Sequence, residues 1–86
     1  MATPMITARD AKQAGAAIRR LRRKLGLTQA ELGARMNVRQ ATISKLEAGE
    51  PATQLRILMD ALAAMDLELI IRPRSSGADD DLEAMF

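Results

Sequence analysis

The stretch from Gly26 to Gly49 constrains the fold most, because it leaves room for only two short helices and a tight turn. Thr28 is followed three residues later by Glu31. This is the pattern of a capping box, in which each side chain bonds to the other residue's backbone N–H at the start of a helix. The sequence therefore predicts a helix from about Gln29 to Met36.

A turn and a second short helix follow. Asn37 tolerates the left-handed backbone that a tight turn demands, and Val38 supplies an apolar side chain to fill it. The second helix runs from about Gln40 to Ala48 and ends at Gly49. The apolar residues expected to be buried in the two helices are Ala30, Leu32, Met36, Ile43 and Leu46. Two short helices joined by such a turn form a helix-turn-helix, whose second helix enters the major groove in many DNA-binding proteins.

A longer helix is expected before this motif. Thr7 followed by Asp10 resembles a capping pair that could start it, and Gly26 supplies a C-terminal stop. Apolar residues at helical spacing between these limits predict its buried side: Ala14, Ile18, Leu21 and Leu25.

A fourth helix is expected after Pro51, which breaks the chain, with Thr53 as its N-cap. Its apolar residues cover a wide arc: Leu55, Ile57, Leu58, Met59, Ala61, Leu62, Ala64 and Met65. So wide an arc on a small domain predicts that more than one subunit buries this helix.

The spacing of the apolar residues changes after Asp66. The run up to Pro73 is apolar and β-branched and predicts one short strand: Leu67, Glu68, Leu69, Ile70, Ile71 and Arg72. A single strand leaves its backbone N–H and C=O groups unpaired. We therefore expect it to pair with the same strand of a second copy across a two-fold axis. The alternative is a fifth helical segment that continues from the fourth helix.

One domain accounts for the organised part of the chain. Residues 1–6 carry no periodic pattern and are expected to be disordered, whereas residues 7–73 are expected to form the DNA-binding and dimerisation domain. Residues 74–86 are expected to form a flexible acidic tail. Three large apolar residues interrupt this tail: Leu82, Met85 and Phe86. They belong either to a loose segment or to a short motif that binds a partner.

Missing residue types exclude most catalytic chemistry. The 86-residue chain has no cysteine, histidine, tyrosine or tryptophan, which removes thiolate metal sites, the commonest general base and the usual Ser-His or Cys-His pairs. We expect no enzyme, and no catalytic residue, metal site, cofactor or small-molecule substrate. The apolar stretches are too short to span a membrane, and no signal-peptide pattern opens the chain, so a cytoplasmic protein is expected.

Charge is distributed unevenly along the chain. Residues 1–56 carry eleven basic and four acidic side chains, a net charge of +7. Residues 57–86 carry two basic and seven acidic side chains, a net charge of −5. A polyanion would therefore bind the first part and avoid the second. A solvated basic helix face is the alternative explanation of the first part.

The residues from Leu27 to Gly49 strongly resemble the Xre/phage-repressor family. The match covers the Thr28-Gln29 cap, the turn, the run Gln40-x-Thr42-Ile43-Ser44 and the run Leu46-Glu47-x-Gly49. The resemblance implies a mostly α, lambda-repressor-like helix-turn-helix domain of four helices plus one C-terminal strand that pairs across a homodimer. It also implies an ion pair that holds the first helix against the third, for which Glu47 and Arg22 occupy the matching places.

The family reads bases with residues at the start of its recognition helix, and the matching positions here are Arg39, Gln40, Ala41, Ser44 and Lys45. Gln40 can bond bidentately to adenine. Arg39 stands where the family usually has a serine or threonine cap, so we expect it to contact a phosphate or a guanine instead. The expected phosphate contacts are Thr28, Gln29 and Thr42. For several of these residues, an ordinary solvated surface side chain is the alternative.

The order of elements is more narrowly similar to that of the HipB-like antitoxins. This resemblance implies a homodimeric repressor that binds an inverted-repeat operator before its own genes, at the bacterial nucleoid, and holds a HipA-like kinase toxin. One alternative is a stand-alone Xre-family regulator of the prophage type with no toxin partner. Another is an interaction module whose basic face meets an acidic protein.

Overall fold

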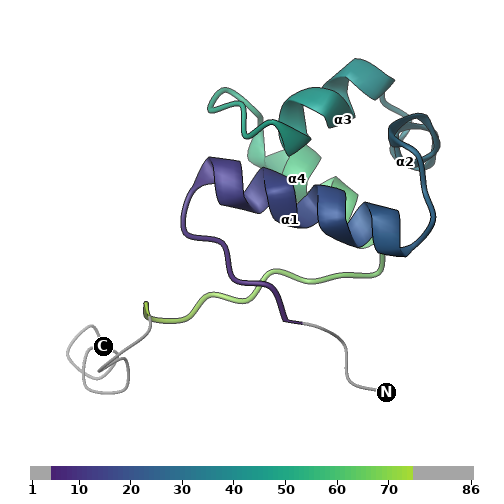
Figure 1. Ribbon diagram of the computed structural model, residues 1–86. Coiled ribbons are helices and arrows are strands. Elements are labelled where there is room, and N and C mark those ends of the chain that lie inside the picture. The colour runs from purple at the N-terminus through teal and green to yellow at the C-terminus, as the bar shows by residue number, and fades with distance from the viewer. Residues whose placement is uncertain (1–4, 75–86) are drawn as a thin grey trace.

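The computed structural model describes residues 5–74 and contains four helices in that range. They are α1 (Ala11–Lys24), α2 (Gln29–Met36), α3 (Gln40–Glu47) and α4 (Leu55–Ala64). In Figure 1, α2 and α3 lie on one side of the long α1, and α4 lies behind α1. The predicted four-helix, helix-turn-helix fold is confirmed. No helix in the described part is long and apolar enough to cross a membrane.

The four helices meet in one small apolar core. Its buried side chains come from every helix and from the end of α4: Ile18, Leu32, Ile43, Leu46, Ile57, Ala61, Leu62 and Met65. Leu32 and Ile43 are completely buried, so α2 and α3 are anchored by one residue each at the centre of the core. Met36 and Val38 pack against this core from the turn between the two helices.

The N-cap of α1 lies three residues later than its first capping candidate. Asp10, and not Thr7, is the N-cap: its carboxylate accepts a hydrogen bond from the Gln13 N–H at 2.7 Å. Leu25 was expected in the buried stripe but is 54% exposed. It lies past the last helical turn, directly before Gly26, whose φ of +73° turns the chain away. The predicted stop at Gly26 is confirmed, whereas the predicted burial of Leu25 is wrong.

Two further predictions about the helices are wrong. Gln54, and not Thr53, precedes the first turn of α4, and it makes no side-chain cap hydrogen bond. Ala30 is exposed because it lies on the outer side of α2, opposite Leu32. On α4, the chain itself covers only part of the apolar arc, and Leu55 and Met59 remain 67% and 42% exposed.

The segment after α4 runs as an irregular, largely exposed chain. Asp66 adopts a left-handed conformation with φ of 58°, so the helix cannot continue, and the predicted alternative of a fifth helical segment is wrong. In Figure 1 the segment passes below α1 and crosses the N-terminal residues. There the Arg72 guanidinium donates to the Thr7 hydroxyl at 3.0 Å.

No strand forms among residues 5–74, because a strand needs a second backbone and the single chain supplies none to this segment. Pairing across a homodimer stays a prediction. The expected disorder of residues 1–6 and 74–86 falls almost entirely outside the described residues.

Candidate nucleic-acid interface

Two local features fix α2 and α3: the cap at the start of α2 and the tight turn between the two helices. At the start of α2, the predicted capping box is present: Thr28 Oγ1 accepts from the Glu31 N–H at 3.0 Å, and Glu31 Oε1 accepts from the Thr28 N–H at 3.0 Å. Asn37 adopts the expected left-handed backbone, with φ of 58°. A Cβ on Gly33 would lie only 2.8 Å from the Val38 carbonyl oxygen, so only glycine fits there without a shift of the turn.

A buried ion pair joins α1 to the end of α3. The Arg22 guanidinium donates through Nε to Glu47 Oε2 at 2.6 Å and through Nη2 to Oε1 at 3.0 Å. Its Nη1 donates to the Leu27 carbonyl at 2.7 Å, at the entrance to α2. The side chains of the pair are only 8% and 3% exposed. The geometry therefore matches the pairing that the resemblance implied, and it ties α1 to α3 and to the loop that leads into α2.

The ion pair shifts the pKa values of both groups. The hydrogen bond with Glu47 raises the pKa of Arg22, although burial opposes this. Burial alone would raise the pKa of Glu47. Hydrogen bonds from Arg22 and Gln29, with attraction to Arg22 and Arg19, outweigh it, and the pKa of Glu47 is lowered. Both groups are therefore charged at neutral pH.

Two glutamines extend this pair toward the surface. Gln29, the first residue of α2, donates through Nε2 to Glu47 Oε1 at 3.1 Å. Gln40, the first residue of α3, donates through Nε2 to Gln29 Oε1 at 3.3 Å. The sequence does not predict the link between Gln29 and Glu47, because residues so far apart in the chain show no periodic signal. The fold alone brings them together.

The outer side of α3 presents the residues that the sequence predicted to read bases. They are all exposed: Arg39, Gln40, Ala41, Ser44 and Lys45. Arg39 is the N-cap of α3 and makes no side-chain cap hydrogen bond, as expected, so its guanidinium is not used to close the helix. Thr42 is half-buried. We call the five exposed residues the α3 face; their contacts with bases stay predictions.

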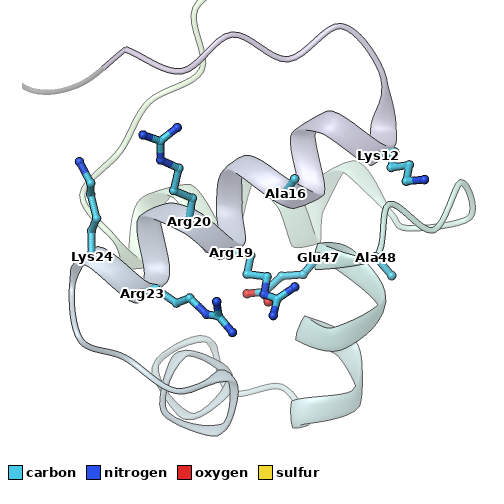
Figure 2. Close-up of a pocket in the computed structure, with 8 residues that line it drawn as sticks. All are labelled: Lys12, Ala16, Arg19, Arg20, Arg23, Lys24, Glu47 and Ala48. Atoms are coloured by element: carbon cyan, nitrogen blue, oxygen red, sulfur yellow. The ribbon is translucent and has the colours of Figure 1, made fainter.

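A second charged surface lies beside this network on α1. Figure 2 shows an open hollow between α1 and the end of α3, which we call the basic groove. It is lined by Lys12, Ala16, Arg19, Arg20, Arg23, Lys24, Glu47 and Ala48. The cluster of basic residues at the end of α1 is visible in the sequence. The sequence does not show that Lys12 joins it or that Glu47 forms part of the wall.

A family model described as Helix-turn-helix matches residues 18–70, from the middle of α1 to the segment after α4. The chain belongs to the Xre-type helix-turn-helix family. No curated protein matches the sequence. In this helix-turn-helix protein, the matched region holds the whole network from Arg22 to Gln40 and the complete α3 face.

Solved structures of HipB are similar to this helix-turn-helix chain. A HipB variant in a complex with an O2 20mer has a TM-score of 0.76 and 27% identity, over 84% of this chain and 100% of that chain. HipB in an O4 20mer complex has a TM-score of 0.76 and 25% identity, over 83% and 100%. A HipA-HipB-O2-O3 complex has a TM-score of 0.75 and 25% identity, over 83% and 100%.

Two sets of predicted residues are not brought to this interface. Residues 67–72 lie apart from the α3 face, after α4 and beside the N-terminal residues. Leu82, Met85 and Phe86, the predicted partner motif, lie outside the described residues.

Proposed function

We propose that this chain is a sequence-specific DNA-binding repressor that acts as a homodimer on an inverted-repeat operator. We further propose that it is the antitoxin of a HipBA-like module, which represses its own operon and neutralises a HipA-like kinase toxin. It acts at the nucleoid in the cytoplasm and is not an enzyme.

The bond between Gln29 and Gln40 carries the DNA-binding part of the proposal. Base reading demands side chains held at a fixed position, because bidentate bonds to a base tolerate little error in geometry. Gln40 is held by Gln29, which is held by the buried Glu47. The second amide hydrogen of Gln40 and its amide oxygen are left for adenine. Gln29 and Thr28 lie at the N-terminus of α2, where an anionic phosphate is favoured.

Exposed apolar residues support the homodimer. Leu69, Ile70 and Ile71 are 51%, 59% and 91% exposed in consecutive positions. Leu55 and Met59 of α4 add further apolar surface. Each such side chain gains roughly 1.5–3 kcal/mol when it is fully buried. A second copy that pairs along residues 67–72 would satisfy the backbone of the segment and bury part of this apolar surface.

The similarity to HipB supports the antitoxin part. The solved HipB structures include complexes named for O2, O3 and O4, and one of them also holds HipA. They are covered over essentially their whole length by this chain, at 25–27% identity. A stand-alone regulator would have the same DNA-binding residues and would lack the toxin partner.

Fluorescence anisotropy tests the repressor with the labelled duplex that lies directly upstream of its own reading frame. We expect this duplex to bind at least about 10³-fold more tightly than a shuffled duplex of equal length at physiological salt. Equal affinity for the two would contradict operator recognition. Co-expression with the product of the neighbouring reading frame tests the antitoxin. If no stable complex with a kinase-like product forms, the chain is a stand-alone regulator and the antitoxin proposal is wrong.

A further inference from the structure

The basic groove holds five cations that have no salt-bridge partner in the described part of the chain. They are Lys12, Arg19, Arg20, Arg23 and Lys24, and none of them forms an ion pair or a side-chain hydrogen bond among residues 5–74. Arg19 and Arg23, like Arg20 and Lys24, are four positions apart on α1, where like charges destabilise a helix. A bound anion would therefore stabilise α1 as well as fill the groove.

Glu47 is the one carboxylate among the described residues that line the groove, and it attracts Arg19 without forming a hydrogen bond or ion pair with it. Glu47 already accepts hydrogen bonds from Arg22 on both oxygens and from Gln29 on one of them. Ala16 and Ala48 are small, so they leave a hollow of about 700 Å³ between α1 and the end of α3. In Figure 2, Arg19 and Arg23 lie on the side of α1 that faces α3, whereas Arg20 and Lys24 project from the opposite side of the helix. The groove is open at the surface, so an extended acidic segment of a polypeptide can enter it.

The chain's own sequence contains such a segment. Asp79, Asp80, Asp81 and Glu83 place four carboxylates in five positions. The chain before them ends its described part at Arg74, whose Nη2 donates to the Arg9 carbonyl at 3.3 Å. Arg9 lies three residues before Lys12, the N-terminal end of the groove.

The reach of the chain fits the length of the groove. Residues 79–83 follow Arg74 by five to nine residues, so they can extend to roughly 17–30 Å from it. Lys12 and Arg19 are about 10 Å apart along the axis of α1. The acidic residues can therefore pass round the start of α1 and reach Lys12 and Arg19.

We propose that the basic groove is a docking site for the chain's own acidic segment, residues 79–83. Because the segment is tethered, its effective concentration at the groove is of the order of millimolar. The groove is joined to the α3 face through Glu47, Gln29 and Gln40. A docked segment would compete there with the DNA backbone and weaken binding that depends on charge alone. This consequence rests on the proposed function, whereas the docking itself does not.

Carbodiimide cross-linking tests the docking without DNA. This reagent joins a carboxylate directly to a lysine amine in contact with it, and the chain has only three lysines. Lys12 and Lys24 line the groove, whereas Lys45 is exposed on α3 and serves as the internal control. Trypsin releases residues 75–86 as one peptide, so mass spectrometry can count its links to each lysine.

At low salt we expect links from this peptide to Lys12 or Lys24 at least about fivefold more often than to Lys45, and their loss in 0.5 M salt. The D79N/D80N/D81N/E83Q variant should lose them, which separates the acidic segment from the terminal carboxylate. A mixture of isotopically light and heavy protein tells whether the segment comes from the same subunit or the partner. Absence of links, or equal links to Lys45, would overturn the proposal.

Anisotropy with a shuffled duplex tests the consequence. At 50 mM salt the neutralised-segment variant should bind this duplex about fivefold more tightly than the unchanged chain. The gain should vanish when Arg19→Gln and Arg23→Gln are added, and persist when Arg35→Gln and Arg56→Gln remove the same charge elsewhere. Circular dichroism confirms that each variant is folded. If no duplex binds while the cross-links form, the proposed function fails and the docking stands.

Discussion

The Gln40 side-chain amide donates a hydrogen bond to the Gln29 side-chain oxygen at 3.3 Å, so the first residues of α3 and α2 are bonded to each other. Through Gln29 the contact continues to Glu47 at 3.1 Å and from there to Arg22. One polar chain thus runs from the buried interior to the surface of α3. An ion pair that stabilises the fold also positions the residue expected to read DNA.

Gln29→Ala and Gln40→Ala should not act independently. Gln40→Ala removes the proposed adenine contact, with an expected loss of about 1–3 kcal/mol in operator binding. Gln29→Ala removes the support of Gln40, so part of the same loss should appear. The double variant should bind more tightly than additivity predicts, by about 0.5 kcal/mol or more. Anisotropy titrations of the four proteins measure this coupling, and strict additivity would show that Gln29 does not position Gln40.

Removing one partner of the buried ion pair should destabilise the protein strongly. Glu47→Gln leaves the Arg22 guanidinium buried without its counter-charge, and the expected loss is about 3–5 kcal/mol in the free energy of unfolding. The exposed pair Arg56–Asp60, with a separation of 3.5 Å, is the control. Arg56→Ala should change stability by no more than about 0.5 kcal/mol. Urea denaturation at pH 7 measures both, and comparable losses would contradict the account.

Acid should weaken the fold through Glu47. Its pKa is lowered in the folded protein, so the carboxylate contributes stability that is fully present above its unfolded pKa, about 4.3, and is lost as pH falls through the lower folded pKa. Urea denaturation of the unchanged chain should show a falling midpoint below about pH 5. Glu47→Gln should flatten this dependence.

Glu31 is a second carboxyl whose pKa is lowered, so the pH experiment needs a matched variant at this position. The pKa of Glu31 is lowered by its hydrogen bonds with the Thr28 backbone and hydroxyl, so some acid dependence should survive in Glu47→Gln. Glu31→Gln is the matched variant, and it should keep most of the dependence because Glu47 is still present. If Glu31→Gln alone removes the pH dependence, the ion pair is not its source.

Much of this arrangement could be predicted from the sequence where the signal is local. The limits of α2, its capping box and the left-handed Asn37 follow from short-range chemistry, and all three are confirmed. Local sequence does not decide where α1 starts, because Thr7 and Asp10 are both good N-caps. Asp10 caps α1, whereas the Thr7 hydroxyl accepts from Arg72, far along the chain.

The tertiary part could not be read from the residues alone. Nothing local distinguishes Gln29 as a partner of Glu47 from Gln29 as a surface amide. Likewise, the periodic stripe of α4 includes Leu55 and Met59, yet the chain covers neither fully. Such a stripe marks which residues are apolar, and only the packing shows which of them the subunit itself buries.

Ile71→Asp should prevent dimerisation without unfolding the subunit. Ile71 is 91% exposed in the single chain, so an aspartate there meets water in the monomer and would be buried only in a dimer. Light scattering after size-exclusion chromatography should report a dimer for the unchanged chain and a monomer for the variant. Glu68→Asp is the control in the same segment. A dimer that persists in Ile71→Asp would place the subunit contact elsewhere.

Selection from a pool of randomised duplexes shows whether the α3 face reads DNA sequence at all. We expect enrichment of an inverted repeat with half-site centres about 10–10.5 base pairs, or a multiple of that, apart. Selection with Gln40→Ala should lose the preference for one adenine in each half-site and keep the rest. A pool that shows no enriched sequence, or an unchanged preference with Gln40→Ala, would contradict base reading by the α3 face.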